Sequence, residues 1–308
     1  MIVVFGSLNM DLVLTVPSLP RPGETVLCDD YVTKPGGKGA NQAVAAARAG
    51  ADVAMVGRVG ADEFGRRLID NLRAHGVATA GVAVSDRPTG VAYICVDTNG
   101  ENSIAVASGA NLAVAGDLIP AGMLGPQTTI VLQMEVPPAE NWAVIDAARA
   151  AGGRSVLNVA PAAPVPRAAL EAVDVLVVNE LEALAVADTL GLATDGPGRA
   201  AQAISRTAGV DCVVTLGGDG AMAATDGRVL AVDAMPIEPV DTTGAGDAFT
   251  GVLAAALDGG FDLSGALRRA AVGAALACLA LGAQESLPTA RAIDANLDKL
   301  PPARPIEL

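Results

Sequence analysis

The stretch VDTTGAGDAFTG at Val240–Gly251 predicts the most about this chain. Two glycines flank an alanine, an aspartate follows, and an alanine- and leucine-rich run begins at once, which is typical of a glycine loop that opens a helix. The backbone N–H groups of Gly244, Ala245 and Gly246 are expected to lack helical partners and to form an anion site. Asp247 is expected to project into that site and accept a proton from an attacking hydroxyl, as phosphoryl transfer to an alcohol needs. The alternative is an ordinary glycine turn in which Asp247 only caps the helix.

A second glycine cluster, KPGGKGANQA at Lys34–Ala43, precedes another alanine-rich helix that is predicted to end near Gly50. It is not a P-loop, because Lys38 is followed by Gly39 and not by Ser or Thr. No dinucleotide-binding G-x-G-x-x-G follows a strand either. The sequence therefore predicts anion sites at helix N-termini but contains neither the P-loop nor the dinucleotide-binding motif. For Lys38, the alternative is an ordinary solvated lysine in a loop.

Composition sets limits on the fold and on the partners. Hydrophobic residues make up 51% of the 308 residues but aromatic residues only 2%, so alanine, valine and leucine must fill the core. The net charge of −14 predicts repulsion from nucleic acid and anionic membrane, so neither is expected as a partner and any phosphate site must be local. Four widely spaced cysteines favour a reducing cytoplasm over a disulfide or zinc framework.

The apolar start of the chain, Met1–Phe5, lacks a basic leader and is too short for a signal peptide. The alanine-rich stretch Ala270–Ala283 is too short to span a bilayer and is predicted to be a buried helix. His75, the only histidine, is expected to cap a helix C-terminus, so triads and zinc sites that need histidine are poorly supported.

Short β-branched runs alternate with alanine-rich runs, which predicts an α/β, doubly wound, mostly parallel sheet with helices on both faces. The predicted buried strands are Val3–Phe5, Val53–Val56, Ile130–Gln133, Ser155–Val159, Val175–Val178 and Cys212–Leu216. The predicted helices are Asn41–Ala49, Glu63–His75, Ala139–Ala151, Glu180–Leu190 and Pro197–Ala208.

Two segments, Leu12–Thr33 and Val82–Ala107, show alternating apolar and polar residues with no helix between them. This pattern predicts antiparallel strands that form a small sheet outside the main body.

Four stretches in this order resemble the ribokinase/PfkB family of carbohydrate kinases: GSLNMD at 6–11, GGKGAN at 36–41, NELE at 179–182 and DTTGAGD at 241–247. The resemblance covers essentially the whole chain. It implies one kinase domain over residues 1–308, with a β-sheet lid over the sugar site built from insertions at about 12–33 and 82–107. In this family the lid often forms a dimer contact, so a homodimer through the lid is expected.

The resemblance also implies the sugar contacts. Carboxylates and amides suit that role because they pair with vicinal hydroxyls. From the residues alone, Asp11 is also compatible with a turn at the end of a strand and Glu135 with an acid that starts a helix. The implied contacts are Asn9, Met10, Asp11, Gly37, Lys38, Gly39, Ala40, Asn41 and Glu135.

For ATP, the resemblance implies contacts from a glycine turn that follows a buried strand, and it implies that Glu182 helps to organise Mg²⁺. The turn alone is equally compatible with a tight hairpin into Ala221–Ala224. Ala271 stands where relatives commonly carry a polar residue near the adenine. The implied ATP contacts are Asn179, Thr215, Leu216, Gly217, Gly218, Asp219, Gly220, Gly246, Asp247 and Ala271.

A monovalent cation, K⁺, is implied behind the anion site, although the residues alone favour a plain exposed loop there. Glu285 stands where a proline is usual. The implied K⁺ ligands are Asp241, Thr243, Ala277, Ala280, Gly282 and Ser286.

The expected activity is the ATP-dependent phosphorylation of D-ribose at its 5-hydroxyl, which gives D-ribose 5-phosphate and ADP. The same chemistry on fructose, another pentose or a nucleoside is the first alternative, since the sequence does not show the shape of the pocket. A non-catalytic sugar-binding protein on a kinase scaffold is the second alternative, and Asp247 with the intact glycine loop disfavours it.

Overall fold

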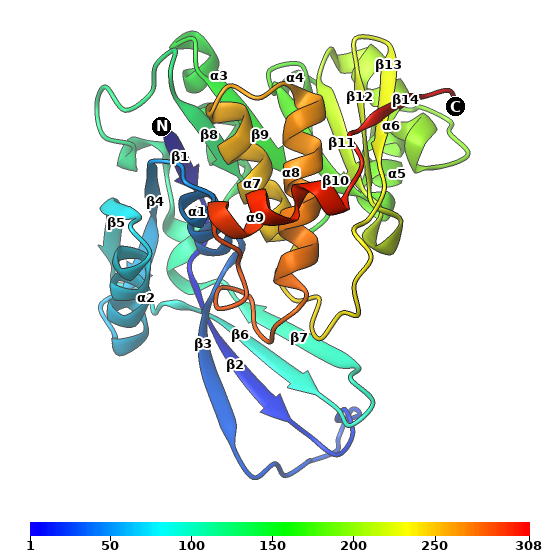
Figure 1. The fold of residues 1–308 in the computed structure, drawn as a ribbon. Coiled ribbons are helices and arrows are strands. Elements are labelled where there is room, and N and C mark those ends of the chain that lie inside the picture. Colours follow the sequence, from blue (N-terminus) through cyan, green and yellow to red (C-terminus); the bar gives the residue numbers. More distant parts are fainter.

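The computed structural model describes all 308 residues, and it is built around one ten-stranded sheet (Figure 1). The strand order is β14-β13-β12-β11-β10-β9-β8-β1-β4-β5. The parallel strands are β1 (Ile2–Phe5), β4 (Val53–Gly60), β5 (Ala78–Ser85), β8 (Thr129–Leu132), β9 (Arg154–Asn158), β10 (Val175–Asn179) and β11 (Asp211–Thr215). An antiparallel edge is formed by β12 (Ala221–Thr225), β13 (Arg228–Val232) and β14 (Arg304–Ile306). The predicted doubly wound, mostly parallel sheet is confirmed.

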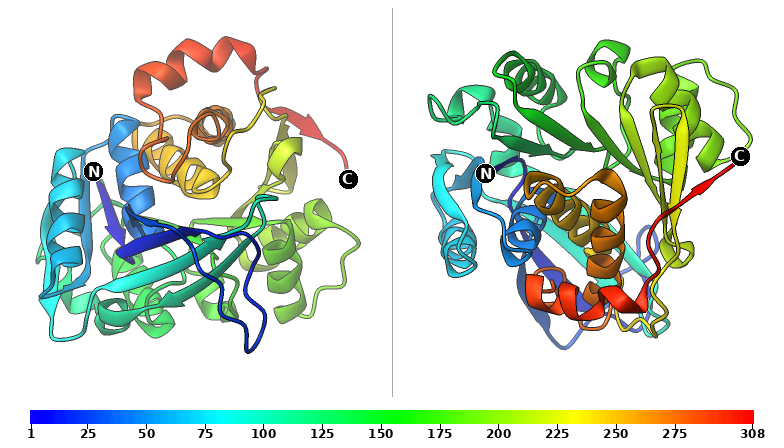
Figure 2. Two further views of the ribbon diagram at one scale, coloured as in Figure 1. Left: turned by 90° about the horizontal axis from the view of Figure 1, so that it is seen from below. Right: turned by 45° about the horizontal axis from the view of Figure 1, so that its top comes forward.

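Helices cover both faces of this sheet, as Figure 2 shows. In β1, Ile2 and Val4 belong to one hydrophobic core while Val3 and Phe5 belong to the other, because successive side chains point to opposite faces. The first core is covered by α1 (Lys38–Arg48), α2 (Glu63–Ala74), α7 (Ala245–Asp258), α8 (Leu263–Ala277) and α9 (Ala290–Asn296). The second is covered by α3 (Pro138–Ala150), α4 (Arg167–Leu170), α5 (Glu180–Thr189) and α6 (Pro197–Ala208), and the single tryptophan, Trp142 of α3, packs there.

Small side chains let the helices of the first core approach closely. At Gly251 of α7, an added Cβ would lie 2.5 Å from the Cβ of Ala45 in α1. At Gly273 of α8, it would lie 2.8 Å from the side chain of Val252 in α7. The alanine- and glycine-rich composition therefore serves tight helix packing with few aromatic side chains. None of the helices combines the length and apolar character that crossing a bilayer needs.

A second sheet of four strands, called the small sheet below, projects from the main body in the order β3-β2-β6-β7 (Figure 1). Its strands are β2 (Asn9–Thr15), β3 (Tyr31–Gly36), β6 (Gly90–Val96) and β7 (Asn102–Ala107). The expectation of purely antiparallel pairing is wrong, because β2 and β6 pair in parallel. The parallel strands β1 and β5 of the large sheet lead directly into β2 and β6, so these two enter the small sheet in the same direction.

Three sequence-based boundaries also differ. Val82, where the second small-sheet segment was expected to begin, lies in β5 at the edge of the large sheet. Like the strands of the small sheet, β5 is only partly buried. The helix expected at Ala270–Ala283 ends at Ala277, and the residues beyond it form a loop. The helix expected from Asn41 already begins at Lys38, so the glycine cluster supplies its first turn. His75 is the C-terminal cap residue of α2, as expected.

The topology points to one place for a ligand. β1 lies between β4 and β8, and the chain proceeds outward from β1 in opposite directions. In open α/β sheets, ligands bind at the carboxyl ends of the strands where the strand order reverses. Gly6–Met10 follow β1 at this point and Gln133–Glu135 follow β8.

Candidate active site

Asp247 lies in the first turn of α7 and is 6% exposed. Its carboxylate is held by two amides from α1: Asn41 Nδ2 donates to Oδ2 at 2.9 Å, and Gln42 Nε2 donates to Oδ1 at 2.9 Å. Each carboxylate oxygen keeps a further lone pair for a substrate hydroxyl. Two side chains of another helix thus fix the Asp247 carboxylate, an arrangement that a residue serving only as a helix cap does not require.

The N-terminus of α7 provides free backbone donors next to this carboxylate. The N–H groups of Gly246 and Asp247 have no acceptor in the protein, and neither does that of Gly244, whereas the N–H of Ala245 donates to Thr242 O at 3.2 Å. The expectation that Ala245 is also a free donor is therefore wrong. Gly244 has φ +76°, which favours glycine, and an added Cβ there would lie 3.1 Å from Ala283. The first turn of α7 therefore leaves two N–H groups free beside the Asp247 carboxylate, those of Gly246 and Asp247.

The N-terminus of α1 is closed by the protein itself. Lys38 N donates to Glu135 Oε2 at 3.0 Å, and Ser7 Oγ donates to the same oxygen at 2.5 Å. Gly39 N in turn donates to Ser7 Oγ at 3.2 Å. An added Cβ at Gly39 would lie 2.5 Å from Ser7 N, so only glycine fits. Glu135 thus occupies the anion position that the second glycine cluster predicted. Ser7 lies in the stretch GSLNMD at 6–11, but no role was predicted for it.

Asp11 differs from the other carboxylates because it accepts no hydrogen bond from the protein, although it lies against the backbone of Gly36. Burial, together with the negative charges of Glu135, Asp247 and Glu285, raises the pKa of Asp11 to about 7. Such an unpaired carboxylate is well suited to accept hydroxyl groups from a sugar.

Two neighbours of Asp11 in β2 have different surroundings. Asn9 Oδ1 accepts a hydrogen bond from Asn111 Nδ2 at 2.7 Å, so Asn111 fixes the orientation of this amide. Met10 is fully buried in the first core, so its side chain packs there.

Lys38 lies in a cavity of about 180 Å³ that is also lined by Asn179, Glu182, Gly246 and Asp247. The charge of Asp247 raises the pKa of Lys38, against the effect of burial and with help from Glu135 and Glu182. Although Lys38 was expected to contact the sugar, its cavity joins the glycine loop to α5. That position fits a transferring phosphoryl group as well.

Asn179 and Glu182 cap α5 reciprocally. Glu182 N donates to Asn179 Oδ1 at 2.8 Å, and Asn179 N donates to Glu182 Oε2 at 2.8 Å. Burial raises the pKa of Glu182, while the Asn179 N–H and the charge of Lys38 act in the opposite direction. The capping box holds the Glu182 carboxylate at the cavity wall.

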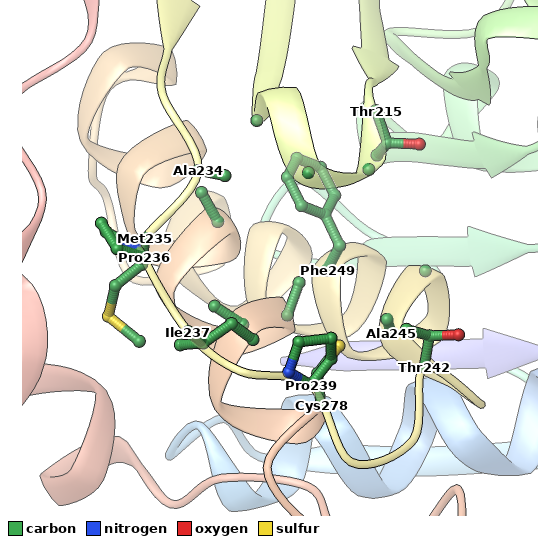
Figure 3. Close-up of a pocket in the computed structure, with 17 residues that line it drawn as sticks. Thr215, Ala234, Met235, Pro236, Ile237, Pro239, Thr242, Ala245, Phe249 and Cys278 are labelled. Atoms are coloured by element: carbon green, nitrogen blue, oxygen red, sulfur yellow. The ribbon is translucent and has the colours of Figure 1, made fainter.

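A larger cavity of about 540 Å³ adjoins this one, since Thr215 and Gly246 line both. Figure 3 shows the segment from Ala234 to Pro239 along one side, with Thr215 at the end of its strand. Phe249, Ala271 and Cys278 complete an apolar wall of the size that a nucleoside needs.

The glycine turn after β11 is a hairpin that also lines the larger cavity. Leu216 N donates to Gly220 O at 2.8 Å and β11 pairs antiparallel with β12, so the turn is a hairpin. Gly217, Gly218 and Gly220 nevertheless line the larger cavity, as expected for ATP contacts. Leu216 packs against the second core instead, and Asp219 is not part of the cavity wall.

The loop expected to hold K⁺ is anchored on Asp241. Thr243 N donates to Oδ1 and Gly282 N to Oδ2, each at 2.9 Å, while Ser286 Oγ donates to Gly282 O at 2.6 Å. Burial opposes ionisation, but hydrogen bonds from Thr243 and Gly282 and the charge of Lys34 hold the pKa of Asp241 below its ordinary value. Carboxylate, hydroxyl and carbonyl oxygens at the C-terminal end of α8 form a donor set that fits a monovalent cation.

For Mg²⁺, no group of three or more His, Cys, Asp or Glu side chains forms a metal cage. Mg²⁺ usually needs only one or two carboxylates in addition to substrate phosphates and water. Glu182 at the cavity wall fits that limited role.

Several buried amides around Asp247 were not found from the sequence. Gln42 adjoins the predicted Asn41 and gave a weak signal by position alone. Asn158, Gln133 and Gln284 come from distant segments, and no local pattern marks them.

The model of the pfkB family carbohydrate kinases matches residues 1–290. The chain is 37% identical to a ribokinase of Bacillus subtilis, over 95% of this chain and 98% of that protein. Its structure is similar to that of a ribokinase from Thermotoga maritima, with a TM-score of 0.90, 32% identity, and coverage of 97% of this chain and 99% of that chain. It is also similar to an Arabidopsis thaliana ribokinase solved with ribose and ATP, with a TM-score of 0.86, 30% identity, and coverage of 96% and 98%. The chain therefore belongs to the pfkB family of carbohydrate kinases.

Proposed function

We propose that the protein catalyses the ATP-dependent phosphorylation of D-ribose at the 5-hydroxyl, giving D-ribose 5-phosphate and ADP. The observation that carries this proposal is the position of Asp247, which is held by two amides beside two free backbone N–H groups. A nucleotide-sized cavity is lined by Ala245 and Gly246, directly before this carboxylate. The identity of 37% to a ribokinase over nearly the whole chain supports ribose as the acceptor.

In the proposed reaction, Asp247 accepts the proton of the 5-hydroxyl as its oxygen forms a bond to the γ-phosphorus of ATP. The bond from that phosphorus to the bridging oxygen breaks, and ADP leaves with the electron pair. The free N–H groups of Gly246 and Asp247, with the ammonium of Lys38, stabilise the charge on the phosphoryl oxygens. Thr215, Gly217, Gly218, Gly220 and Asn179 are proposed to contact ATP, and Ala271 the adenine side of its cavity.

On the sugar side, Asp11 is proposed to accept hydrogen bonds from two sugar hydroxyl groups, because no group of the protein donates a hydrogen bond to its carboxylate. Asn9 and Asn41 supply amides, and Gly37, Gly39 and Ala40 let the sugar approach the backbone at the start of α1. A ligand that lacks one hydroxyl would leave Asp11 unpaired, which favours a polyhydroxylated substrate.

Two metal ions complete the proposal. When bound, Mg²⁺ would neutralise charge on the phosphates, and Glu182 would help to hold it. K⁺ would be held by oxygens of Asp241, Thr243, Ala277, Ala280, Gly282 and Ser286, behind the glycine loop. The hydrogen bonds that Asp241 accepts from Thr243 and Gly282 tie the segment before α7 to the Gly282 loop, which supports a cation that stiffens the anion site.

The small sheet is proposed to act as a lid on a single kinase domain of residues 1–308. Asp11 lies on β2 of this sheet and faces the site, which supports a role in covering the sugar. Its strands also expose Tyr31, Tyr93, Ile104 and Val106. An apolar surface of this kind supports a homodimer through the lid. Four free thiols support the cytoplasm as the compartment.

A coupled assay of ATP consumption over a panel of pentoses, hexoses and nucleosides tests the proposed activity. The highest kcat/KM is expected with D-ribose, and a higher value with a nucleoside or fructose would replace ribose as the substrate. Ribose binding without ATP turnover, in the presence of Mg²⁺ and K⁺, would instead favour the non-catalytic sugar-binding protein.

A further inference from the structure

A continuous chain of side-chain amides, all buried except the half-buried Asn71, ends on the carboxylate of Asp247. On one side, Asn71 Nδ2 donates to Gln284 Oε1 at 2.6 Å, and Gln284 Nε2 donates to Asn41 Oδ1 at 2.9 Å. Asn41 Nδ2 then donates to Asp247 at 2.9 Å. On the other side, Gln133 Nε2 donates to the Oε1 of Gln42 at 2.8 Å, and Gln42 donates to the second oxygen of Asp247.

The direction of every hydrogen bond in this chain follows from Asp247. An ionised carboxylate only accepts, so Asn41 must present its NH₂ group to it. The Oδ1 of Asn41 then points away and needs a donor, which only the NH₂ group of Gln284 provides. Gln284 is 2% exposed, so water does not take over this role.

A buried acceptor at the other end of the chain supports the same direction. Gln133 uses its NH₂ group on Gln42, and its Oε1 is left buried without a partner. Such an acceptor is costly. Turning the Gln133 amide over would give its oxygen a donor only if the Gln42 amide turned as well. The oxygen of Gln42 would then face the carboxylate of Asp247, so the unpaired Gln133 Oε1 is tolerated.

We propose that Gln284 is a positioning residue for Asp247, which acts by fixing the orientation of the Asn41 amide. The proposal rests on the proposed role of Asp247 as the base. Gln284 lies in the same loop as Gly282, whose N–H is bound by Asp241. The side chain of Gln284 therefore links the loop that contains Gly282 to the orientation of the Asp247 carboxylate.

Without the Gln284 donor, Asn41 is free to rotate its amide and turn its oxygen toward Asp247. The amide oxygen of Asn41 and the carboxylate of Asp247 repel each other. The carboxylate then keeps the hydrogen bond from Gln42 but loses the one from Asn41. A base that is misplaced by a fraction of an ångström slows the chemical step much more than it weakens binding.

Gln284→Leu and Gln284→Glu test the proposal in the full-length protein, with Gln127→Glu on the exposed surface as a matched control. We expect kcat to fall about 10- to 100-fold in both Gln284 variants, while the KM for ATP changes less than about threefold and the ribose Kd rises by a smaller factor than kcat falls, because Asn41 also supplies an amide to the sugar. The control is expected to keep its kcat. Equal losses in kcat and in ribose affinity, or an unchanged kcat, would overturn the proposal.

A double-mutant cycle separates positioning from a structural role. If Gln284 acts only through Asn41, then Gln284→Leu adds no further loss of kcat to Asn41→Leu, and additive losses would exclude the proposal. Should a Gln284 variant not fold, Asn71→Leu at the outer end of the chain is expected to lower kcat several-fold, and an unchanged kcat counts against the chain.

Asp247→Asn distinguishes the two proposals. If this variant stays active, then the proposed base is wrong. If it is inactive while folded Gln284 variants keep full activity, then only the positioning role of Gln284 fails.

Discussion

Ribose binding is expected to release a proton from Asp11 below neutral pH. In the ligand-free protein, burial and three neighbouring carboxylates raise the pKa of this group to about 7. Bound ribose would donate hydroxyl hydrogen bonds to the ionised form, which favours that form and lowers the pKa in the complex. In the ligand-free protein, Asp11 is therefore protonated at low pH. It must lose its proton before it can accept hydrogen bonds from both ribose hydroxyl groups.

The size of the effect follows from this pKa. If the complex keeps Asp11 ionised throughout, then the ribose Kd is about tenfold higher at about pH 6 than at about pH 8, which is about 1.4 kcal/mol of binding free energy. About 0.9 proton should leave per ribose bound at about pH 6, and about 0.1 at about pH 8. Above pH 8 the Kd should be independent of pH.

Isothermal titration calorimetry at low pH, in two buffers with different ionisation enthalpies, measures the proton release directly. The control is Asp11→Asn, which keeps the size of the side chain but has no titrating group, so its residual binding should show no buffer dependence. An observed binding enthalpy that is the same in both buffers for the unmodified protein would refute the reasoning. The same buffer dependence in Asp11→Asn would assign the proton to another group.

The same variant reports on stability. Because the folded state raises the pKa of Asp11 from 3.8 to about 7, it holds this proton more tightly than the unfolded chain does. The stability contributed by the group is complete below about pH 4 and is lost as pH rises to about 7. Asp11→Asn avoids this loss and is expected to raise the free energy of unfolding by ~2–4 kcal/mol at about pH 8. Chemical denaturation that shows no gain there contradicts the buried position of the charge.

Asp247→Asn is expected to lower kcat at least ~10²-fold with little change in either KM, because the amide keeps its size but accepts no proton. Steady-state kinetics with near-normal kcat would remove Asp247 as the base. Potassium is expected to give faster turnover than tetramethylammonium at constant ionic strength and saturating magnesium, since a cation near Asp241 would hold the free N–H groups in place. Equal rates in both salts would exclude the cation site, and activation that survives in Ser286→Ala would exclude only that ligand. Gly251→Ala is expected to cost ~1–3 kcal/mol of stability, because its Cβ would lie 2.5 Å from that of Ala45; an unchanged denaturation midpoint would show that α1 and α7 separate freely.

The parts of the fold that were predicted correctly depend on short-range patterns. Buried parallel strands give continuous apolar runs, and helices end at glycines, so the central sheet could be predicted from the sequence alone. The half-exposed strand β5 was missed, because its alternation is the same whether the strand belongs to the large sheet or to the small one. The pairing direction of β2 and β6 follows from the order of β1 and β5 in the large sheet, which no local pattern contains.

The candidate site divides in the same way. Asp247 and Gly246 lie in one motif, so their proximity could be predicted from spacing. The partner of Glu135 is the start of α1, nearly one hundred residues away along the chain, and it forms only when β1 and β8 pair. The hydrogen bond of Ala245 depends on the exact path of the turn, so the sequence named Ala245 as a free donor where the structure has Asp247.

The scarcity of aromatic residues separates the optical signals of the two parts of the molecule. Both tyrosines, Tyr31 and Tyr93, lie on the small sheet, while the only tryptophan, Trp142, lies in α3 of the main body. Selective excitation of the indole therefore reports on the main body, and the phenol absorption and emission report on the small sheet. Any movement of the small sheet during sugar binding would therefore be observable by stopped-flow fluorescence without any attached dye.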